Sequence, residues 1–296
     1  MEVLRIDQLN KKYGAIHAVK NLNLSIQKGE IFGLLGPNGS GKTTTLGMVL
    51  GITKQNSGSF SWFGEGSTAT NRKNIGALLE TPNFYPYLNA DKNLEIIAHI
   101  KRVKTPNFDD LLDLVNLKHR RKSKFKTYSL GMKQRLAIAA ALVGNPEVLI
   151  FDEPTNGLDP QGIAEVRETI IKIAERGKTI IMASHILDEV EKVCSHVAII
   201  KNGSLLATGT VGSIMNSDLQ VEIAASDNEA LKSLLGQLPE IKHLQEVRDK
   251  LILEVNNSFS TSKLNQFAFD NGIVLTHLAA KSKSLEEEFL EITQNN

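Results

Sequence analysis

Apolar and polar residues alternate in short stretches over the first thirty positions and follow helical spacing further along the chain. The stretches VLRI and AVKNLNLSI are separated by the turn-like sequence KKYG, a pattern that predicts antiparallel strands. From about residue 88 to residue 142 the apolar positions recur every three or four residues, which indicates helices. We therefore expect a β-rich subdomain first, followed by a helical subdomain at about residues 85–142.

Apolar runs of strand length return after the helical block. They lie at 148–151, 179–184, 196–200 and 204–209, and a helical pattern from about 163 to 175 separates the first two. A strand, a helix and a second strand in this order predict a parallel sheet. The pattern over residues 1–215 is therefore typical of an α/β fold.

The remaining residues, 216–296, show a different pattern. Strand-like stretches such as LQVEIA and LILEV alternate with helical stretches such as EALKSLLGQL. The complete order is β-α-β-β-α-β with a final helix, which predicts a small ferredoxin-like α+β domain. No motif within it suggests catalysis, so we expect two domains, 1–215 and 216–296, with the chemistry in the first.

The sequence GPNGSGKT, residues 36–43, lies between an apolar strand-like run and a helical stretch. A loop in this position directs backbone N–H groups and a helix N-terminus at a phosphate chain, which predicts a nucleoside triphosphate site. Lys42 places an ammonium near the β- and γ-phosphates, and Thr43 offers a hydroxyl to Mg²⁺. The residues assigned to this site are Gly36, Pro37, Asn38, Gly39, Ser40, Gly41, Lys42, Thr43 and Thr44.

Two acidic residues follow the apolar run at 148–151. Because the carboxyl ends of parallel strands meet at one edge of a sheet, Asp152 and Glu153 are expected beside the phosphate loop. We expect Asp152 to hold Mg²⁺, directly or through water. Glu153 is expected to orient and polarise the attacking water, since phosphoryl transfer needs positioning and charge neutralisation from the protein.

The composition, with 41% apolar and 23% charged residues, is that of a globular protein. A formal net charge of +1 argues against a broad nucleic-acid-binding surface. One basic run remains, which is either a solvated face or a contribution to nucleotide phosphates or to an acidic partner surface. It contains Lys118, Arg120, Arg121, Lys122, Lys124 and Lys126.

Membrane-spanning and secretory signals are not evident. No eighteen apolar residues run together, and the N-terminal stretch carries charges at every few positions, so we expect a cytoplasmic protein with neither signal peptide nor membrane span. The single cysteine, Cys194, lies among apolar residues at helical spacing. We interpret it as a small buried side chain without a chemical role.

Taken in order, the motifs resemble the ATP-binding subunit of an ATP-binding cassette (ABC) transporter. The resemblance covers about residues 1–215 and rests on Tyr13, GPNGSGKT, a loop ending in Glu80, YSLGMKQRL, VLIFDEPTNGLDP and the Ser-His pair at 184–185. It implies an ATPase that uses ATP and Mg²⁺ to drive a separate integral-membrane permease. The location implied is the inner face of the cell membrane, reached through that permease.

The resemblance also implies how two subunits share the nucleotide. The stretch SLGMKQ looks like the cassette signature, so Ser129, Gly131 and Gln134 are expected to contact the ATP held by the opposite subunit. A head-to-tail dimer follows, and one kind of chain can supply both halves. The further assignments are Asp159 in the loop that crosses the interface, Tyr13 on the adenine and His185 on the γ-phosphate.

Glu80 departs from the family pattern, which most often has a glutamine that senses Mg²⁺ and contacts the permease. An ionised carboxylate cannot donate hydrogen bonds and adds negative charge beside the metal, so altered coordination and coupling are expected. The aromatic stretch at 84–87 follows and is either a socket for a permease helix or ordinary packing. This loop, the signature stretch and the C-terminal domain look like the bacitracin-resistance and lantibiotic-immunity branch, which exports peptide antibiotics.

Two other functions compete with that of a transporter motor. A soluble ABC ATPase that acts as a switch on ribosomes or DNA usually carries two cassettes or a long coiled coil, and this sequence shows neither. A P-loop GTPase or small-molecule kinase is disfavoured because the guanine-reading NKxD pattern is missing, since NKKY at 10–13 lacks the acid. The transported compound, the direction of transport and the identity of the second cassette stay open.

Overall fold

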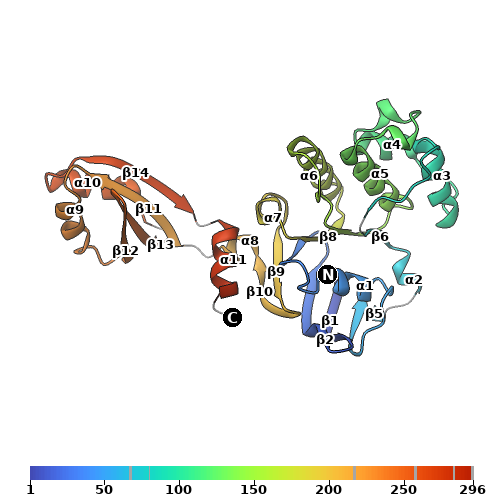
Figure 1. The fold of residues 1–296 in the computed structure, drawn as a ribbon, viewed down its shortest axis with the longest axis horizontal. Coiled ribbons are helices and arrows are strands. Elements are labelled where there is room, and N and C mark those ends of the chain that lie inside the picture. Colours follow the sequence, from blue (N-terminus) through green and yellow to red (C-terminus); the bar gives the residue numbers. More distant parts are fainter. Residues whose placement is uncertain (67–68, 80, 216–217, 257–258, 283, 295–296) are drawn as a thin grey trace. The chain divides into compact units, whose positions relative to one another are not determined.

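The structure is a computed structural model of the 296-residue chain, and it describes all residues except 67–68, 80, 216–217, 257–258, 283 and 295–296. The chain forms two compact units, Met1–Val211 and Gly212–Asn295 (Figure 1). Within the described ranges, no helix combines the length and the apolar character needed to cross a bilayer.

The first unit begins with an antiparallel sheet of four strands in the order β2-β1-β4-β5. Buried and exposed residues alternate along much of β1 and β2, because one face of the sheet packs on the core and the other faces solvent. The strands are β1 (Glu2–Tyr13), β2 (Ile16–Gln27), β4 (Ser57–Trp62) and β5 (Glu65–Gly66). The antiparallel strands predicted from the N-terminal pattern are confirmed.

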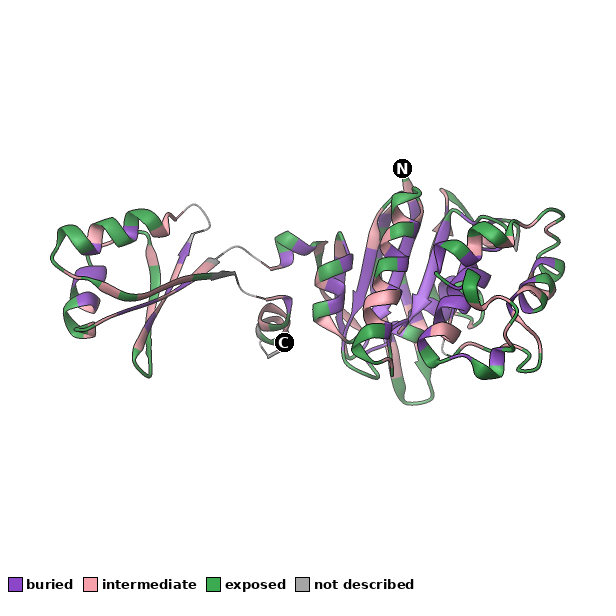
Figure 2. Cartoon of the chain, turned by 90° about the horizontal axis from the view of Figure 1, so that it is seen from above, coloured by how far each residue is buried: buried purple, intermediate pink, exposed green. Residues whose placement is uncertain are grey.

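A six-stranded sheet in the order β10-β9-β3-β8-β7-β6 forms the second layer. Its strands are β3 (Ile31–Leu35), β6 (Ile75–Leu78), β7 (Val148–Asp152), β8 (Thr179–Ser184), β9 (His196–Lys201) and β10 (Ser204–Thr210). All neighbouring pairs are parallel except the hairpin of β9 and β10. Every residue of β7 and β8 is buried, which explains their continuous apolar sequences. Figure 2 shows that the buried residues of the first unit gather on its strands, with exposed residues on the helices and loops around them.

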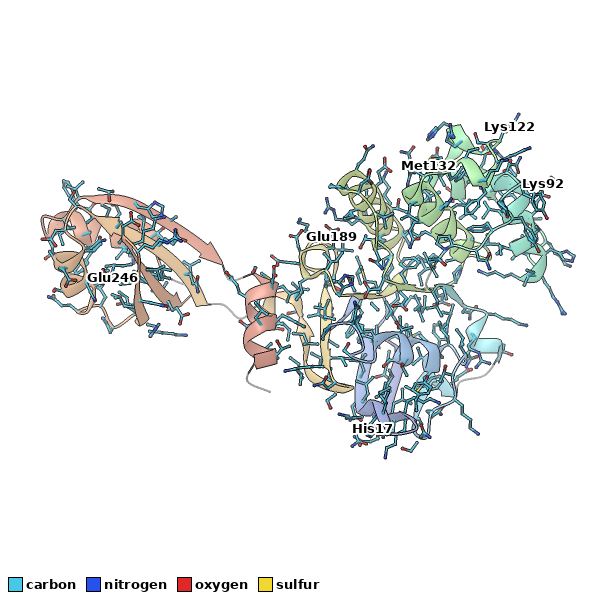
Figure 3. All side chains as sticks on the ribbon, in the orientation of Figure 1. His17, Lys92, Lys122, Met132, Glu189 and Glu246 are labelled. Atoms are coloured by element: carbon cyan, nitrogen blue, oxygen red, sulfur yellow. The ribbon has the colours of Figure 1, made fainter. Side chains whose placement is uncertain are left out.

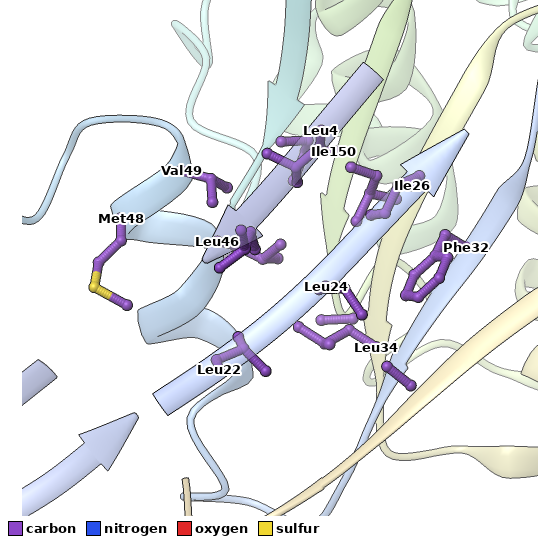
Figure 4. Close-up of a cluster of buried hydrophobic side chains, with 14 of the residues drawn as sticks. Leu4, Leu22, Leu24, Ile26, Phe32, Leu34, Leu46, Met48, Val49 and Ile150 are labelled. Carbon is purple, nitrogen blue, oxygen red and sulfur yellow. The ribbon is translucent and has the colours of Figure 1, made fainter. Parts of the chain in front are cut away.

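Helix α1 (Lys42–Val49) joins the two sheets. Its Leu46 and Val49 belong to one buried cluster with Leu4 of β1 and Ile150 of β7 (Figure 4). Trp62, the only tryptophan of the chain, is fully buried, and its indole Nε1 donates to the carbonyl oxygen of Val49 at 2.9 Å. The C-terminal end of α1 is therefore held by a strand of the antiparallel sheet, while its N-terminal end begins at the phosphate loop.

The helical subdomain lies between β6 and β7 in the chain. Residues 134–142 of α5 are all buried, because α3, α4, α6 and β6 all contact this helix. Its helices are α3 (Ala90–Ile100), α4 (Phe108–Leu114) and α5 (Leu130–Leu142), with the 3₁₀ turns η1 (Lys118–Arg120) and η2 (Phe125–Thr127). The other helices of the first unit are α2 (Ala69–Arg72), α6 (Pro160–Glu175) and α7 (Leu187–Val193), and α8 (Val211–Ile214) lies at the boundary.

Helix α6 begins three residues earlier than the apolar pattern predicts. The side chain of Asp159 caps it by accepting a hydrogen bond from the backbone N–H of Gly162 at 2.9 Å, and Pro160 occupies the first helical position. Apolar periodicity starts only at Ile163, so it misses a first turn that is specified by a cap and a proline. The cap, not the periodicity, marks the true start.

The second unit is a four-stranded antiparallel sheet in the order β12-β13-β11-β14. Helices α9 and α10 contact this sheet, and apolar side chains such as Ile223, Leu253 and Leu264 form a core of its own. The elements are β11 (Asp218–Ala225), α9 (Asn228–Leu235), β12 (Ile241–Val247), β13 (Lys250–Asn256), α10 (Thr261–Asp270), β14 (Leu275–Ser282) and α11 (Leu285–Gln294). The predicted ferredoxin-like order is confirmed.

Candidate active site

The phosphate loop occupies residues 36–41, between β3 and α1. Gly41 caps α1 with a left-handed backbone, at φ +108°, and no side chain caps the first turn. A Cβ atom at Gly41 would lie 2.4 Å from the carbonyl oxygen of Ala18, and one at Gly36 would lie 2.1 Å from that of Ile200. Only glycine fits at both positions, and the uncapped N–H groups of the first turn are available to an anion.

Lys42 is buried at the start of α1, with 6% of its surface exposed. Its Nζ donates to the carbonyl oxygens of Gly36 at 2.7 Å and Pro37 at 3.3 Å, and it lies 3.4 Å from Oε1 of Glu153. The loop encloses a cavity of about 170 Å³, the phosphate-loop cavity. It is lined by Ala18, Asn38, Gly39, Ser40, Gly41, Lys42, Thr43, Thr44 and Glu153.

Ser40 supplies a further sign that this cavity suits an anion. Its hydroxyl is buried and has no hydrogen-bond partner among the residues that the structure describes. A buried hydroxyl without a partner is costly, and a phosphate oxygen would accept its hydrogen bond. The loop therefore offers backbone N–H groups, a hydroxyl and an ammonium to one ligand.

Asp152 and Glu153 come at the carboxyl end of β7, as predicted. Asp152 is the last residue of the strand and is 3% exposed. Glu153 has a left-handed backbone, at φ +49°, and its N–H donates to the carbonyl oxygen of Ala183 on β8 at 2.9 Å. A non-glycine residue in this conformation is uncommon and strained, and here it is held by the neighbouring strand.

His185 follows β8 and contacts Glu153 directly. Its Nδ1 lies 2.7 Å from Oε2 of Glu153, and its backbone N–H reaches the same oxygen at 3.4 Å. The Glu153 carboxylate thus lies between the imidazole on one side and the Lys42 ammonium on the other. Sequence reasoning expected the γ-phosphate as the partner of His185 and missed this carboxylate, because the two residues are 32 positions apart.

The signature residues line a second cavity of about 590 Å³, the Ser129 cavity. The Ser129 hydroxyl caps α5 by accepting from the N–H of Met132 at 3.3 Å, just as Asp159 caps α6. A Cβ atom on Gly131 would lie 3.4 Å from the Cα of Gly162, so two glycines let the helix starts approach. Figure 3 shows Met132 at the start of α5. The cavity therefore presents two helix N-termini, which attract negative charge.

Arg135, which sequence reasoning overlooked, is buried beside the Ser129 cavity. Its Nη1 donates to the carbonyl oxygens of Val115 at 2.8 Å and Asn116 at 2.9 Å, and its Nη2 lies 2.9 Å from Oε2 of Glu165 on α6. Burial lowers the pKa of the guanidinium, and Glu165 opposes that shift. The signal that could have revealed it is an arginine within the otherwise apolar run of α5.

The two cavities share no lining residue. Ser129, Gly131 and Asp159 line the Ser129 cavity, whereas Lys42, Thr43 and Glu153 line the phosphate-loop cavity. The residues of each group therefore lie around one cavity, and the two groups do not meet within one chain. Each cavity presents only part of the set of groups assigned to one nucleotide.

Tyr13, at the end of β1, lines neither cavity. It is 48% exposed, and Lys11 Nζ lies 4.7 Å from its ring centroid. Gln134 is buried within α5 and lines neither cavity. Glu80 lies outside the described residues. The Gln134 contact with nucleotide thus stays a prediction, as does the metal role of Glu80.

Comparison with known proteins gives a consistent set of similarities. Residues 19–156 match the family model described as ABC transporter. The chain is 38% identical to the bacitracin transport ATP-binding protein BcrA of Bacillus licheniformis, over 98% of this chain and 97% of that protein. It is 39% identical to the lantibiotic transport ATP-binding protein SrtF of Streptococcus pyogenes, over 69% of this chain and 89% of that protein.

A solved structure extends the comparison to the fold and the ligand. The ATP-binding cassette MJ0796, in a dimeric post-hydrolysis state bound to ADP and Pi, superimposes with a TM-score of 0.62 at 25% identity. The match covers 71% of this chain and 99% of that one.

Proposed function

Because the chain belongs to the ATP-binding subunits of ABC transporters, an assignment that follows from its similarity over nearly full length to BcrA, we propose that it powers the export of peptide antibiotics or similar amphipathic compounds. The family predicted from the motifs is confirmed, and the chain is an ATP-binding ATPase of that family. A soluble switch on ribosomes or DNA is disfavoured because the relatives are transport proteins. The observation that carries the export proposal is that the BcrA match includes the C-terminal unit.

The catalytic step follows from the contacts of Glu153. Its carboxylate orients the water that attacks the γ-phosphate and accepts a proton from that water. His185 holds this carboxylate through Nδ1 at 2.7 Å, so the histidine acts on the base as well as on the phosphate. Lys42 exchanges its loop carbonyls for phosphate oxygens and neutralises charge that develops during transfer. Of these contacts, the one between His185 and Glu153 is already present within this chain.

The oxygen donors at the sheet edge fit Mg²⁺. Thr43 offers a hydroxyl and Asp152 a carboxylate, both hard ligands. In the described part of the chain, no cluster of three or more metal-ligating side chains occurs, which agrees with Mg²⁺ sites that take one or two protein ligands and complete their shell with phosphates and water. When bound by Thr43 and Asp152, the ion would supply positive charge that neutralises the phosphates during transfer.

Two subunits together complete each nucleotide site. The Ser129 hydroxyl, the N–H of Gly131 and the Asp159 loop of one subunit close over the phosphate-loop cavity of the other. Tyr13 stacks on the adenine there. The two cavities share no residue within one chain, which supports this arrangement. In a two-fold pair, the phosphate-loop cavity of each subunit meets the Ser129 cavity of the other. The second subunit is most simply another copy of this chain.

The mechanical work is done on a separate permease. Residues 1–215 act as the cassette, and residues 216–296 act as an accessory domain. The protein is held at the cytoplasmic face of the membrane through the permease, and closure and reopening of the cassette dimer drive the permease between its states.

Export is tested by resistance. The chain is expressed with a candidate integral-membrane permease in a bacitracin-sensitive host, and the inhibitory concentration of bacitracin is measured. We expect it to rise severalfold with the wild-type chain and not with Glu153→Gln, which binds ATP but cannot activate water. Equal resistance with both chains would mean that ATP hydrolysis by this protein is not the cause.

A further inference from the structure

We propose that the segment of the membrane partner that docks on the helical subdomain is acidic. It binds a surface made of Tyr85, Tyr87, Lys122, Lys124 and Lys126, which we name the tyrosine–lysine surface. This inference rests on the proposed function, in which the chain drives a separate permease, and it specifies the chemistry of that contact.

Two backbone segments hold this surface in place. The N–H of Phe125 donates to the carbonyl oxygen of Leu88 at 2.8 Å, and that of Lys126 donates to Pro86 at 2.9 Å. An isolated antiparallel bridge pairs Asn89 with Lys124. The aromatic stretch at 84–87 and the basic run therefore lie side by side, although about forty residues separate them in the sequence, and their backbones are fixed before any partner arrives.

The aromatic residues of this region fall into two groups. Phe84 and Phe125 pack edge to face at 5.1 Å, and Phe125, which is 6% exposed, lies 5.9 Å from Tyr128. Tyr85 and Tyr87 are instead 49% and 62% exposed, with their ring centroids 5.9 Å apart. The inner rings pack against one another and account for the stability of the segment. The two outer rings are not needed for that packing. Paired exposed tyrosines are typical of protein interfaces.

The basic run divides in the same way. Lys118 pairs with Asp109 at 2.9 Å, and Arg121 pairs with Asp91 at 2.8 Å. Lys122, Lys124 and Lys126 are exposed and form no ion pair with any residue that the structure describes. Figure 3 shows Lys122 on the outer side of the helical subdomain. None of these lysines lines the phosphate-loop cavity, which disfavours a contact with the nucleotide phosphates held there. The exposed tyrosines beside the lysines favour an acidic partner over a merely solvated face.

A protein segment suits this surface better than lipid headgroups do. Phe84, next to Tyr85 in the chain, lines a cavity of about 290 Å³ whose lining is mostly apolar but includes Lys101. Such a cavity accepts an apolar side chain of a docked helix, and the tyrosine–lysine surface complements the polar face of the same helix. Carboxylates on that face would meet three cations, which favours the correct partner and speeds association.

The test compares two variants with the same change of charge. Lys124→Glu/Lys126→Glu reverses the tyrosine–lysine surface, and Lys73→Glu/Lys104→Glu reverses two exposed lysines elsewhere in the same unit. Each is expressed with the same candidate permease, and the amount that co-purifies with the permease in detergent is measured at 50 and 500 mM salt. We expect the first variant to lose at least tenfold in co-purification, and the control less than twofold. The ATPase rate of each isolated variant should stay within twofold of wild type.

The outcomes separate this inference from the proposed function. Restoration of the first variant by glutamate-to-lysine changes in the permease segment would confirm the inference. If the wild-type chain co-purifies and both variants do so equally, the partner is not acidic and the inference fails alone. If the first variant keeps the permease but loses binding to phosphatidylglycerol vesicles, lipid is the partner and the inference is wrong. If the wild-type chain does not bind the permease, the proposed function fails and the inference with it.

Discussion

The phosphate-loop cavity and the Ser129 cavity each border a buried cation, and the comparison shows how the two halves of the site differ. Lys42 donates to two carbonyls of its own loop and lies 3.4 Å from Glu153. Arg135 spans two carbonyls at the end of α4 and its connection, and Glu165 of α6. The first cation is held by a loop that binds ligand, and the second is held between helices.

This difference has a chemical basis. A lysine ammonium is a compact charge whose donors rotate freely, so Lys42 can exchange partners, whereas the planar guanidinium of Arg135 is fixed by the directions of its donors. We therefore propose that hydrolysis takes place at the phosphate-loop cavity and that the Ser129 cavity positions the groups that close over it. Changes in the first should alter the rate of hydrolysis, and changes in the second should alter assembly or stability.

The largest expected effect is that of Glu153→Gln. Loss of the base should lower the ATPase rate by about a hundredfold to ten-thousandfold, while the contacts that bind ATP survive and trap an ATP-bound dimer. Phosphate release and gel filtration with ATP and Mg²⁺ measure the two effects. Glu168→Gln, on the exposed surface of α6, is the control and should behave as wild type. A monomer with ATP would count against the shared site.

A mixture of two inactive variants tests whether the phosphate-loop cavity and the Ser129 cavity act within one chain or across two chains. Lys42→Ala removes the phosphate-loop cation, and Ser129→Arg fills the other cavity, so each variant alone should be nearly inactive. An equal mixture that assorts randomly contains half mixed dimers with one intact site of two, which gives about a quarter of wild-type activity. Steady-state ATPase assays measure it. No recovery in a mixture shown to exchange subunits would refute sharing.

Arg135→Ala tests whether the cation beside the Ser129 cavity stabilises the fold more than Lys42 does. Removing this buried cation should lower the free energy of unfolding by about 2 kcal/mol, because two carbonyls and the partly exposed carboxylate of Glu165 lose their donor. Lys42→Ala should cost less than about 1 kcal/mol, since Glu153 keeps His185 and partial solvent contact. Urea unfolding followed by circular dichroism measures both. Equal losses would mean that Lys42 is structural too.

The smallest effect on activity is expected at Cys194, which lies in neither cavity. Burial raises the pKa of its thiol from 9.0 to about 12, so the folded protein holds about a thousandth of the ordinary thiolate at pH 8. Iodoacetamide should therefore react slowly and leave the ATPase rate unchanged. Since the folded pKa is the higher one, the thiol's contribution to stability is complete below pH 9 and is lost as pH rises toward 12. Rapid alkylation of the folded chain at pH 8 would contradict this burial.

Local signals predicted much of this molecule. The phosphate loop, the carboxylates after β7 and the order of helices and strands along the second unit follow from glycine spacing, apolar runs and alternation, which act over a few residues. The contact of His185 with Glu153 and the pairing of residues 84–89 with 121–127 could not be predicted, because they join segments distant in the chain. Neither could the burial of Gln134 and Arg135, since it depends on helices that pack around α5.

The single tryptophan gives this protein a built-in optical probe. Trp62 is fully buried and donates to the last turn of the helix whose first turn begins at Lys42. We expect nucleotide binding at that first turn to change the emission of Trp62, and stopped-flow fluorescence of the unlabelled wild-type chain measures this change in real time, with no dye attached and no residue replaced.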